Sequence, residues 1–299
     1  MKRCTVLFLL LLFTCLLLLP SAFARDAGTI SHMGTTTRFD NAQRNIFIDG
    51  EINYKKVLEI LYGDLTYEND DKYDQPAIWN NIRAPWNEIT YNTGLVFVAF
   101  EGKYTENGIQ KYIILTQTVE SEDATCHACA PIVGGAVFAR YDNRWILESE
   151  NKYIAVTGNW GWMVLPDGVS TETFPPDSSV DLIKIGPDKH GIYYKGSDFN
   201  RGTIFEYIHL IVPYKNTIID SLDIVLEIPE GSYDCEDNQF AENDLGIHLV
   251  HKTNEASDYY DFTVVKQMNE GSCSDRNVRS VKESTNYAFV NGYYKKVQH

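Results

Sequence analysis

Leu95-Val96-Phe97-Val98-Ala99-Phe100 and Tyr112-Ile113-Ile114-Leu115-Thr116-Gln117-Thr118-Val119 flank a polar turn at Asn107-Gly108. The first run is apolar on both faces, as a strand in the middle of a sheet is. Asn-Gly between two β-forming runs is a strong hairpin signal, because both residues tolerate the positive φ angles of a tight turn. The sequence therefore predicts two long antiparallel strands at the beginning of a β-rich region.

The same pattern continues to the end of the chain. Leu222, Ile224 and Leu226 alternate with Asp223 and Glu227, which predicts a strand with one face toward water. Further strands are expected over residues 136–141, 145–155, 181–185, 204–212 and 260–264, and a closing hairpin over 287–297 turns at Asn291-Gly292. The predicted fold is mainly β, with antiparallel meander or sandwich-like sheets and a short helical N-terminal region.

One helix is expected before the β-rich region. Its apolar residues fall at i, i+3, i+4 and i+7, which is one face of a 3.6-residue period; they are Tyr54, Val57, Leu58 and Leu61. Asp49 or Asn53 can cap the beginning of this helix, and Gly63 can end it. The pattern around Trp79, Ile82 and Trp86 predicts a short helical or irregular segment that packs on the sheet.

The first residues match a secretory signal peptide. Lys2 and Arg3 precede an apolar run from Val6 to Leu19, and the sequence ending at Ala24 resembles a cleavage site. We expect cleavage after Ala24, export, and a periplasmic or secreted location. No later stretch is apolar and long enough to cross a membrane, since a span needs about 20 apolar residues.

Composition divides the whole chain into three expected regions. Residues 1–24 are the signal peptide, residues 25–94 a flexible lead-in with the small helical region, and residues 95–299 a β-rich domain. Prolines at 166, 175 and 176 interrupt the β pattern, so we expect a sub-domain junction near residues 162–180.

The formal charge of −15 excludes a nucleic-acid partner, because so acidic a surface repels phosphate backbones. The acidity serves solubility, and it also leaves calcium binding open at two acidic stretches, 68–74 and 234–244. The second stretch does not match an EF-hand, since Gln239 and Leu245 occupy the positions of the required glycine and glutamate. No cofactor is predicted from a motif, and calcium and zinc remain alternatives.

Four cysteines follow the signal peptide, which suits an oxidising compartment. We favour the pairings Cys126–Cys129 and Cys235–Cys273. Cys126-His127-Ala128-Cys129 has three interpretations: a structural clip between strands, a thiol–disulfide active site with catalytic Cys126 and Cys129, and half of a zinc site. The helix that opens at a redox C-x-x-C motif is not predicted after Pro131, so we favour the structural clip.

Two other places carry candidate ligand-binding residues. Trp160 and Trp162 stand in a glycine-containing loop, where they can stack on a sugar or peptide or simply cover the sheet. His190 lies in the turn 186–191 with Asp188, although turns contain such residues for backbone reasons alone. His248 and His251 fall on a predicted strand, where residues three apart point to opposite faces, so they are a weak metal pair.

The combination of Cys-His-Ala-Cys-Ala-Pro at 126–131, Gly-Asn-Trp-Gly at 158–161 and Gly-Pro-Asp-Lys-His-Gly at 186–191 resembles a set of exported bacterial proteins without an assigned activity. The resemblance covers roughly residues 95–212 and implies no catalytic residue. The sequence thus favours a non-catalytic binding or structural module over an enzyme, with a protein, peptide or glycan as partner. The alternative is a thiol–disulfide or metal-dependent enzyme centred on Cys126 and Cys129.

Overall fold

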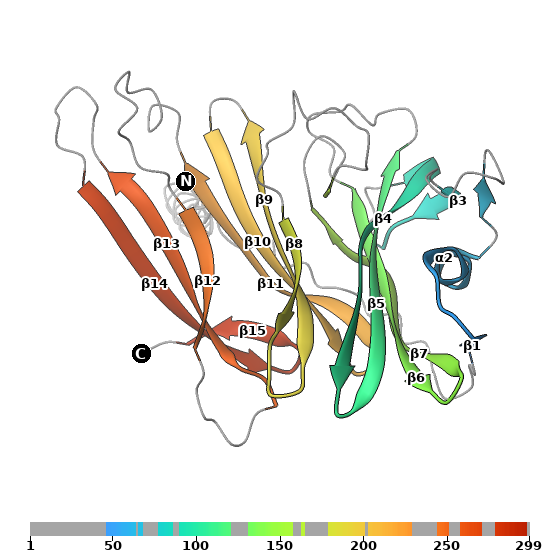
Figure 1. The fold of residues 1–299 in the computed structure, drawn as a ribbon. Helices are drawn as coiled ribbons and strands as arrows, with labels where there is room; N and C mark the ends of the chain where they lie inside the picture. The colour runs from blue at the N-terminus through green and yellow to red at the C-terminus, as the bar shows by residue number, and fades with distance from the viewer. Residues whose placement is uncertain are drawn as a thin grey trace, which may run out of the picture. The chain divides into compact units, whose positions relative to one another are not determined.

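The described part of the chain forms three antiparallel β-sheets and one helix in a computed structural model (Figure 1). The described residues are 46–63, 65–67, 77–85, 90–120, 131–157, 163–164, 179–200, 203–228, 244–250, 258–270 and 279–297. This architecture confirms the predicted mainly β fold with antiparallel sheets and a short helix near its beginning.

The first sheet, called here the N-terminal sheet, has seven strands in the order β1-β7-β6-β5-β4-β3-β2. Their bounds are β1 Phe47–Asp49, β2 Thr66–Tyr67, β3 Ala77–Arg83, β4 Thr90–Glu106, β5 Ile109–Glu120, β6 Ile132–Tyr141 and β7 Arg144–Val156. The predicted hairpin joins β4 to β5, with φ angles of 51° at Asn107 and 76° at Gly108. Both strands are internal to the sheet, as their apolar runs predicted.

The segment around Trp79 is a strand, so the expected helical or irregular segment there is wrong. β3 pairs with β4, and Trp79 is buried beneath the helix. Two asparagines interrupt the alternation of apolar and polar residues that identifies a strand in a sequence. Asn81 adopts a φ of 56°, which asparagine tolerates, and the strand continues beyond it. The domain boundary expected after residue 94 falls inside β4.

Helix α2, Tyr54–Tyr62, confirms the helical period. The Asn53 side chain accepts a hydrogen bond from the Lys56 backbone N–H at 3.1 Å, and the Gly63 N–H donates to the Glu59 carbonyl at 2.9 Å. These contacts satisfy backbone groups that the helix ends leave without a partner. Val57, Leu58, Leu61 and Tyr62 are buried in a cluster with side chains of β3, β6 and β7.

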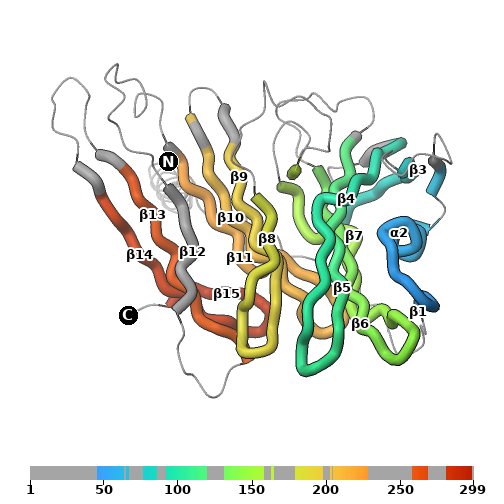
Figure 2. Tube along the Cα trace, viewed as in Figure 1, coloured from blue at the N-terminus to red at the C-terminus, as the bar shows by residue number. Residues whose placement is uncertain are grey.

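Two four-stranded sheets follow in the chain. The central sheet has the order β11-β10-β9-β8, and the C-terminal sheet has the order β12-β13-β14-β15. Their bounds are β8 Ser179–Lys184, β9 His190–Asn200, β10 Thr203–Tyr214, β11 Thr217–Ile228, β12 Asp244–Val250, β13 Asp261–Glu270, β14 Arg279–Val290 and β15 Tyr293–Lys296. Each sheet comes from one stretch of chain, so its coloured strands in Figure 2 have neighbouring colours, except β1, which pairs with β7.

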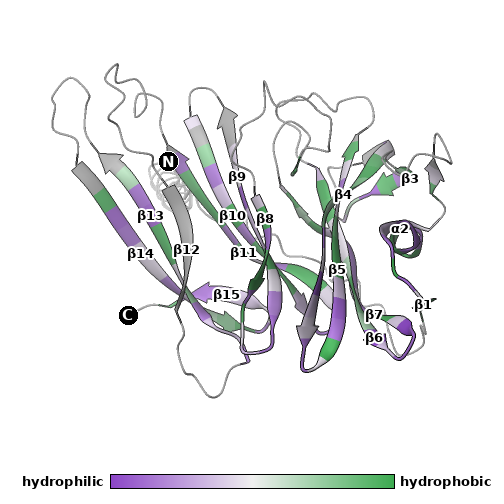
Figure 3. Ribbon diagram, viewed as in Figure 1, coloured by the Kyte–Doolittle hydropathy of each residue, from purple (hydrophilic) through white to green (hydrophobic). Residues whose placement is uncertain are grey.

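Both faces of the central sheet carry buried apolar side chains. One apolar cluster joins it to the N-terminal sheet, with members such as Leu115, Val137 and Ile211. A second cluster joins it to the C-terminal sheet, with members such as Leu222, Phe262 and Val264. Fully burying one such side chain is worth about 1.5–3 kcal/mol, so these clusters hold the sheets together. Figure 3 shows the hydrophobic and hydrophilic segments that alternate along the strands.

Strand β11 shows the predicted alternation. Leu222, Ile224 and Leu226 are buried toward the C-terminal sheet, whereas Asp223 and Val225 are exposed on the other face. Helix α2, the one helix among the described residues, lacks the length and apolar character to cross a bilayer.

Candidate functional site

His209 lies on β10, on the face of the central sheet that is directed toward the N-terminal sheet. Its neighbours Ile208 and Leu210 belong to the cluster with the C-terminal sheet, whereas Tyr207 and Ile211 belong to the cluster with the N-terminal sheet. Since side chains alternate along a strand, His209 shares the face of Tyr207 and Ile211. A histidine has thus been placed between two packed sheets.

A β-bulge brings two aspartates to the same face of β11. Asp220 lies opposite Ile211, and Asp223 lies opposite His209, because the register shifts between Leu210 and Ile211. Residues 220 and 223 would point to opposite faces of a regular strand, since they are three apart. The extra residue of the bulge, Ser221, instead directs its hydroxyl to the Gly292 carbonyl at 2.7 Å.

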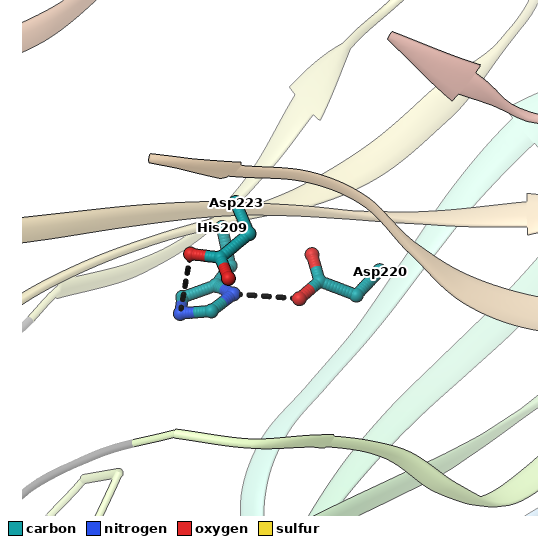
Figure 4. A group of neighbouring side chains, drawn as sticks. All are labelled: His209, Asp220 and Asp223. Atoms are coloured by element: carbon teal, nitrogen blue, oxygen red, sulfur yellow. Dashed lines mark hydrogen bonds and ion pairs between the residues drawn. The ribbon is translucent and has the colours of Figure 1, made fainter. Parts of the chain in front are cut away.

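Both ring nitrogens of His209 have partners (Figure 4). Nδ1 lies 2.7 Å from Asp220 Oδ2, and Nε2 lies 2.7 Å from Thr157 Oγ1 and 3.8 Å from Asp223 Oδ1. Thr157 follows β7 and donates its backbone N–H to the Pro131 carbonyl at 3.4 Å. The three side chains therefore connect the end of β7 with the hairpin of β10 and β11.

The site is closed except at one carboxylate. His209 is 4% exposed and Thr157 is 5% exposed, and the side chains of Asp220 and Asp223 are 10% and 35% exposed. Asp220 Oδ1 is buried and accepts no hydrogen bond from the described part of the chain. A buried carboxylate oxygen without a partner is costly, so this atom is suited to accept a hydrogen bond from a water molecule or to bind a cation.

Two tyrosine rings surround the imidazole. The Tyr194 ring is stacked on His209 with 5.9 Å between centroids, and the Tyr207 ring meets it edge-on at 5.9 Å. Aromatic walls exclude water and lower the local dielectric, which strengthens the interaction of His209 with its carboxylates.

The pKa of His209 is shifted by opposing causes. Burial lowers the pKa of His209, whereas the charge of Asp220, its hydrogen bond and the charge of Asp223 raise it. The net pKa lies above the ordinary value of a histidine, so the site favours the positively charged ring. The site thus attracts positive charge between its two carboxylates.

Two chemistries share this geometry. The order hydroxyl, imidazole, carboxylate in Thr157, His209 and Asp220 is that of a nucleophilic triad. The alternative is cation binding, because one ligand atom from each of His209, Asp220 and Asp223 lies within 4.8 Å of the others. Burial separates the two readings, since a nucleophile must meet a substrate carbonyl and Thr157 is covered by protein.

Of the residues singled out in the sequence, the structure describes His190, the exposed Asp188 in the turn before it, and the backbone of His248 within β12. The His190 ring packs against that of Tyr104 with 4.8 Å between centroids, and its Nδ1 is buried. The adjacent Lys189 forms an ion pair with Glu106. Burial lowers the pKa of His190, partly opposed by Glu106. His190 thus contributes to the contact between β4 and β9.

The remaining predicted site residues lie outside the described residues. They are Cys126, Cys129, Trp160, Trp162, Cys235, Cys273 and His251, together with both acidic stretches apart from Asp244. Their pairing and their roles therefore stay predictions.

Sequence reasoning missed His209, Asp220 and Asp223. The available signal was a histidine inside the apolar run Tyr207-Ile208-His209-Leu210-Ile211, because such a histidine needs a polar partner. The partner depends on the register of the hairpin and on its bulge, which neither residue type nor spacing reveals. No family model, curated protein or solved structure gave a significant match to the chain.

Proposed function

We propose that the protein is an exported, non-catalytic binding module, periplasmic or secreted, with a protein, peptide or glycan partner. Export is supported by the signal-peptide pattern that ends at Ala24. The antiparallel sheets supply a rigid framework, and rigid frameworks with variable loops commonly serve binding.

The observation that carries the non-catalytic role is the closure of the Thr157–His209–Asp220 chain. A catalytic base must lie within about 3 Å of the proton that it removes from a substrate or nucleophile in a reacting position. His209 has both nitrogens engaged and is 4% exposed. This arrangement suits a group that ties two sheets together and holds a ligand in place.

The competing function is a thiol–disulfide or metal-dependent enzyme at Cys126 and Cys129, which is favoured only by the C-x-x-C spacing. Alkylation and mass spectrometry of the exported protein separate the two. For a binding module we expect both cysteines to be oxidised and inert to iodoacetamide without reductant. Rapid exchange of Cys126 with glutathione would contradict the proposal.

Export is tested on the same preparation. We expect the mass of the intact secreted or periplasmic protein to equal that of a chain that begins at Arg25. A chain that stays in the cytoplasm with Met1 to Ala24 attached would overturn the exported part of the proposal.

A further inference from the structure

We propose that His209, Asp220 and Asp223 bind one divalent transition-metal cation of the zinc type between the N-terminal and central sheets. This inference names a ligand for the binding role proposed above and rests on that role. It starts from the cluster of ligand atoms and from the buried oxygen of Asp220 that has no hydrogen-bond partner among the described residues.

The donor set decides the class of cation. One imidazole nitrogen and two carboxylate oxygens suit zinc, which takes histidine and carboxylate ligands in four-coordinate sites. Calcium takes six to eight oxygens, and the described neighbourhood offers two carboxylates and the hydroxyl of Thr157. The two carboxylate charges also balance a divalent cation when the imidazole is neutral.

The size of the cluster fits such an ion. Zinc lies about 2.0–2.2 Å from nitrogen and oxygen ligands, so two ligand atoms of one ion are at most about 4.4 Å apart. The ligand atoms here all lie within 4.8 Å of one another. A movement of a few tenths of an ångström therefore closes the site, and the partly exposed Asp223 provides both that movement and a route from solvent.

The surroundings of His209 resemble a supported metal ligand. A ligating histidine almost always donates its second ring N–H to a carboxylate or carbonyl, which fixes the orientation of the ring. His209 Nε2 has a comparable partner in Thr157 Oγ1 at 2.7 Å, and the stacked Tyr194 ring limits rotation. Nδ1, which lies 2.7 Å from Asp220 Oδ2, is then the nitrogen that binds the cation, and the cation replaces the proton between these two atoms.

The test is zinc binding by the full mature chain after chelator treatment, with free thiols blocked by iodoacetamide so that no cysteine contributes a ligand. Competition with a chromophoric zinc indicator measures stoichiometry and affinity. We expect one equivalent of zinc and an affinity at least about tenfold weaker in Asp223→Asn. Asp181→Asn, an exposed aspartate of β8, makes the same charge change away from the site and should bind like the wild type.

Asp223→Asn is the main variant because its side chain is the most exposed of the three, so the fold survives the change; far-ultraviolet circular dichroism verifies this. Absence of zinc binding, or equal affinity in Asp223→Asn and the wild type, would overturn the metal site. Stoichiometric calcium binding in place of zinc would overturn the class of cation. If any of these results is obtained while Cys126 is inert, the zinc site is wrong but the proposed non-catalytic binding function is unaffected. A reactive Cys126 would contradict that function whatever the zinc result.

Discussion

His209 Nδ1 and Asp220 Oδ2 lie 2.7 Å apart across the β10–β11 hairpin, in an interior surrounded by tyrosine rings. The pair depends on the hairpin register, which sets Asp220 opposite Ile211 and one pleat away from His209. Removing one member of a buried pair is more costly than the pair itself is worth, since the other member stays buried without a partner.

Asp220→Ala should therefore destabilise the protein by about 3–5 kcal/mol. Urea denaturation followed by tryptophan fluorescence measures the change. Asp181→Ala on β8 is the matched control, and an exposed aspartate should alter stability by no more than about 0.5 kcal/mol. A loss in Asp220→Ala as small as in the control would show that the pair has no structural role.

Stability should fall as the pH rises above neutrality. The groups that face His209 are Thr157 after β7, Asp220 and Asp223 from β11, Tyr194 from β9 and Tyr207 from its own strand. Burial lowers the pKa of His209, but Asp220 and Asp223 outweigh it and hold the pKa above its unfolded value of about 6.5. Protonated His209 therefore contributes stability, and this contribution is fully present at pH values below the unfolded pKa. The contribution is lost as the pH rises through the folded pKa.

The pH test compares the metal-free wild type with Asp220→Asn between about pH 6 and pH 9. The asparagine has no charge, so burial, which lowers the pKa of His209, is no longer outweighed, and the decline should disappear in the variant. Parallel pH profiles of unfolding free energy in the two proteins would contradict the assignment of the decline to His209.

Gly134 makes room for a hydrogen bond between the helix and the N-terminal sheet. Tyr62 Oη lies 2.5 Å from Thr116 Oγ1, and burial raises the pKa of Tyr62 to about 12, so the phenol stays neutral. A Cβ at Gly134 would lie 2.4 Å from Tyr62 Oη. Gly134→Ala should cost about 1–3 kcal/mol through overpacking.

A double-mutant cycle separates this contact from other effects. Tyr62→Phe removes the oxygen that the new methyl group would meet, so Gly134→Ala should cost less in that background than in the wild type. Circular dichroism at increasing urea concentration gives the four free energies of unfolding. Strict additivity would show that the methyl group collides elsewhere, for example with the Lys152 carbonyl at 3.0 Å.

Gly186 allows the close approach of two backbone segments. Tyr260 donates its N–H to the Ile185 carbonyl at 2.7 Å, and a Cβ at Gly186 would lie 2.0 Å from the Asp258 carbonyl oxygen. Backbone cannot rotate away as a side chain can. Gly186→Ala should therefore destabilise by about 3 kcal/mol and increase hydrogen exchange at the Tyr260 amide. An unchanged exchange rate would contradict this.

The sequence predicted most of the sheet structure, because turns and alternation are local signals. Asn107-Gly108 and Asn291-Gly292 both adopt positive φ angles and both turn a hairpin. The α2 period and the Asn53 cap are equally local. The strand around Trp79 was not predicted, because Asn80 and Asn81 interrupt its alternation of apolar and polar residues. Its strand conformation depends on pairing with β4, which is not a local signal.

The candidate site could not be predicted to the same extent. His209 and Asp223 are 14 positions apart in the sequence, and they become cross-strand neighbours only after the bulge shifts the register. Thr157 reaches His209 from a different sheet. The candidate residues identified in the sequence lie within a few positions of one another along the chain. The His209 site instead depends on tertiary contacts, which such local spacing does not encode.

Each sheet is a meander of consecutive strands, and the pairing of β1 with β7 is the one exception among the described strands. A chain that emerges from its N-terminus can therefore complete hairpin after hairpin in the order of emergence, with small loop-closure entropy at each step. β1 must wait until β7 has arrived, about 100 residues later. We therefore expect Phe47–Asp49 to pair late in folding. Until they pair, the backbone N–H and C=O groups along the outer edge of β7 have no strand partner.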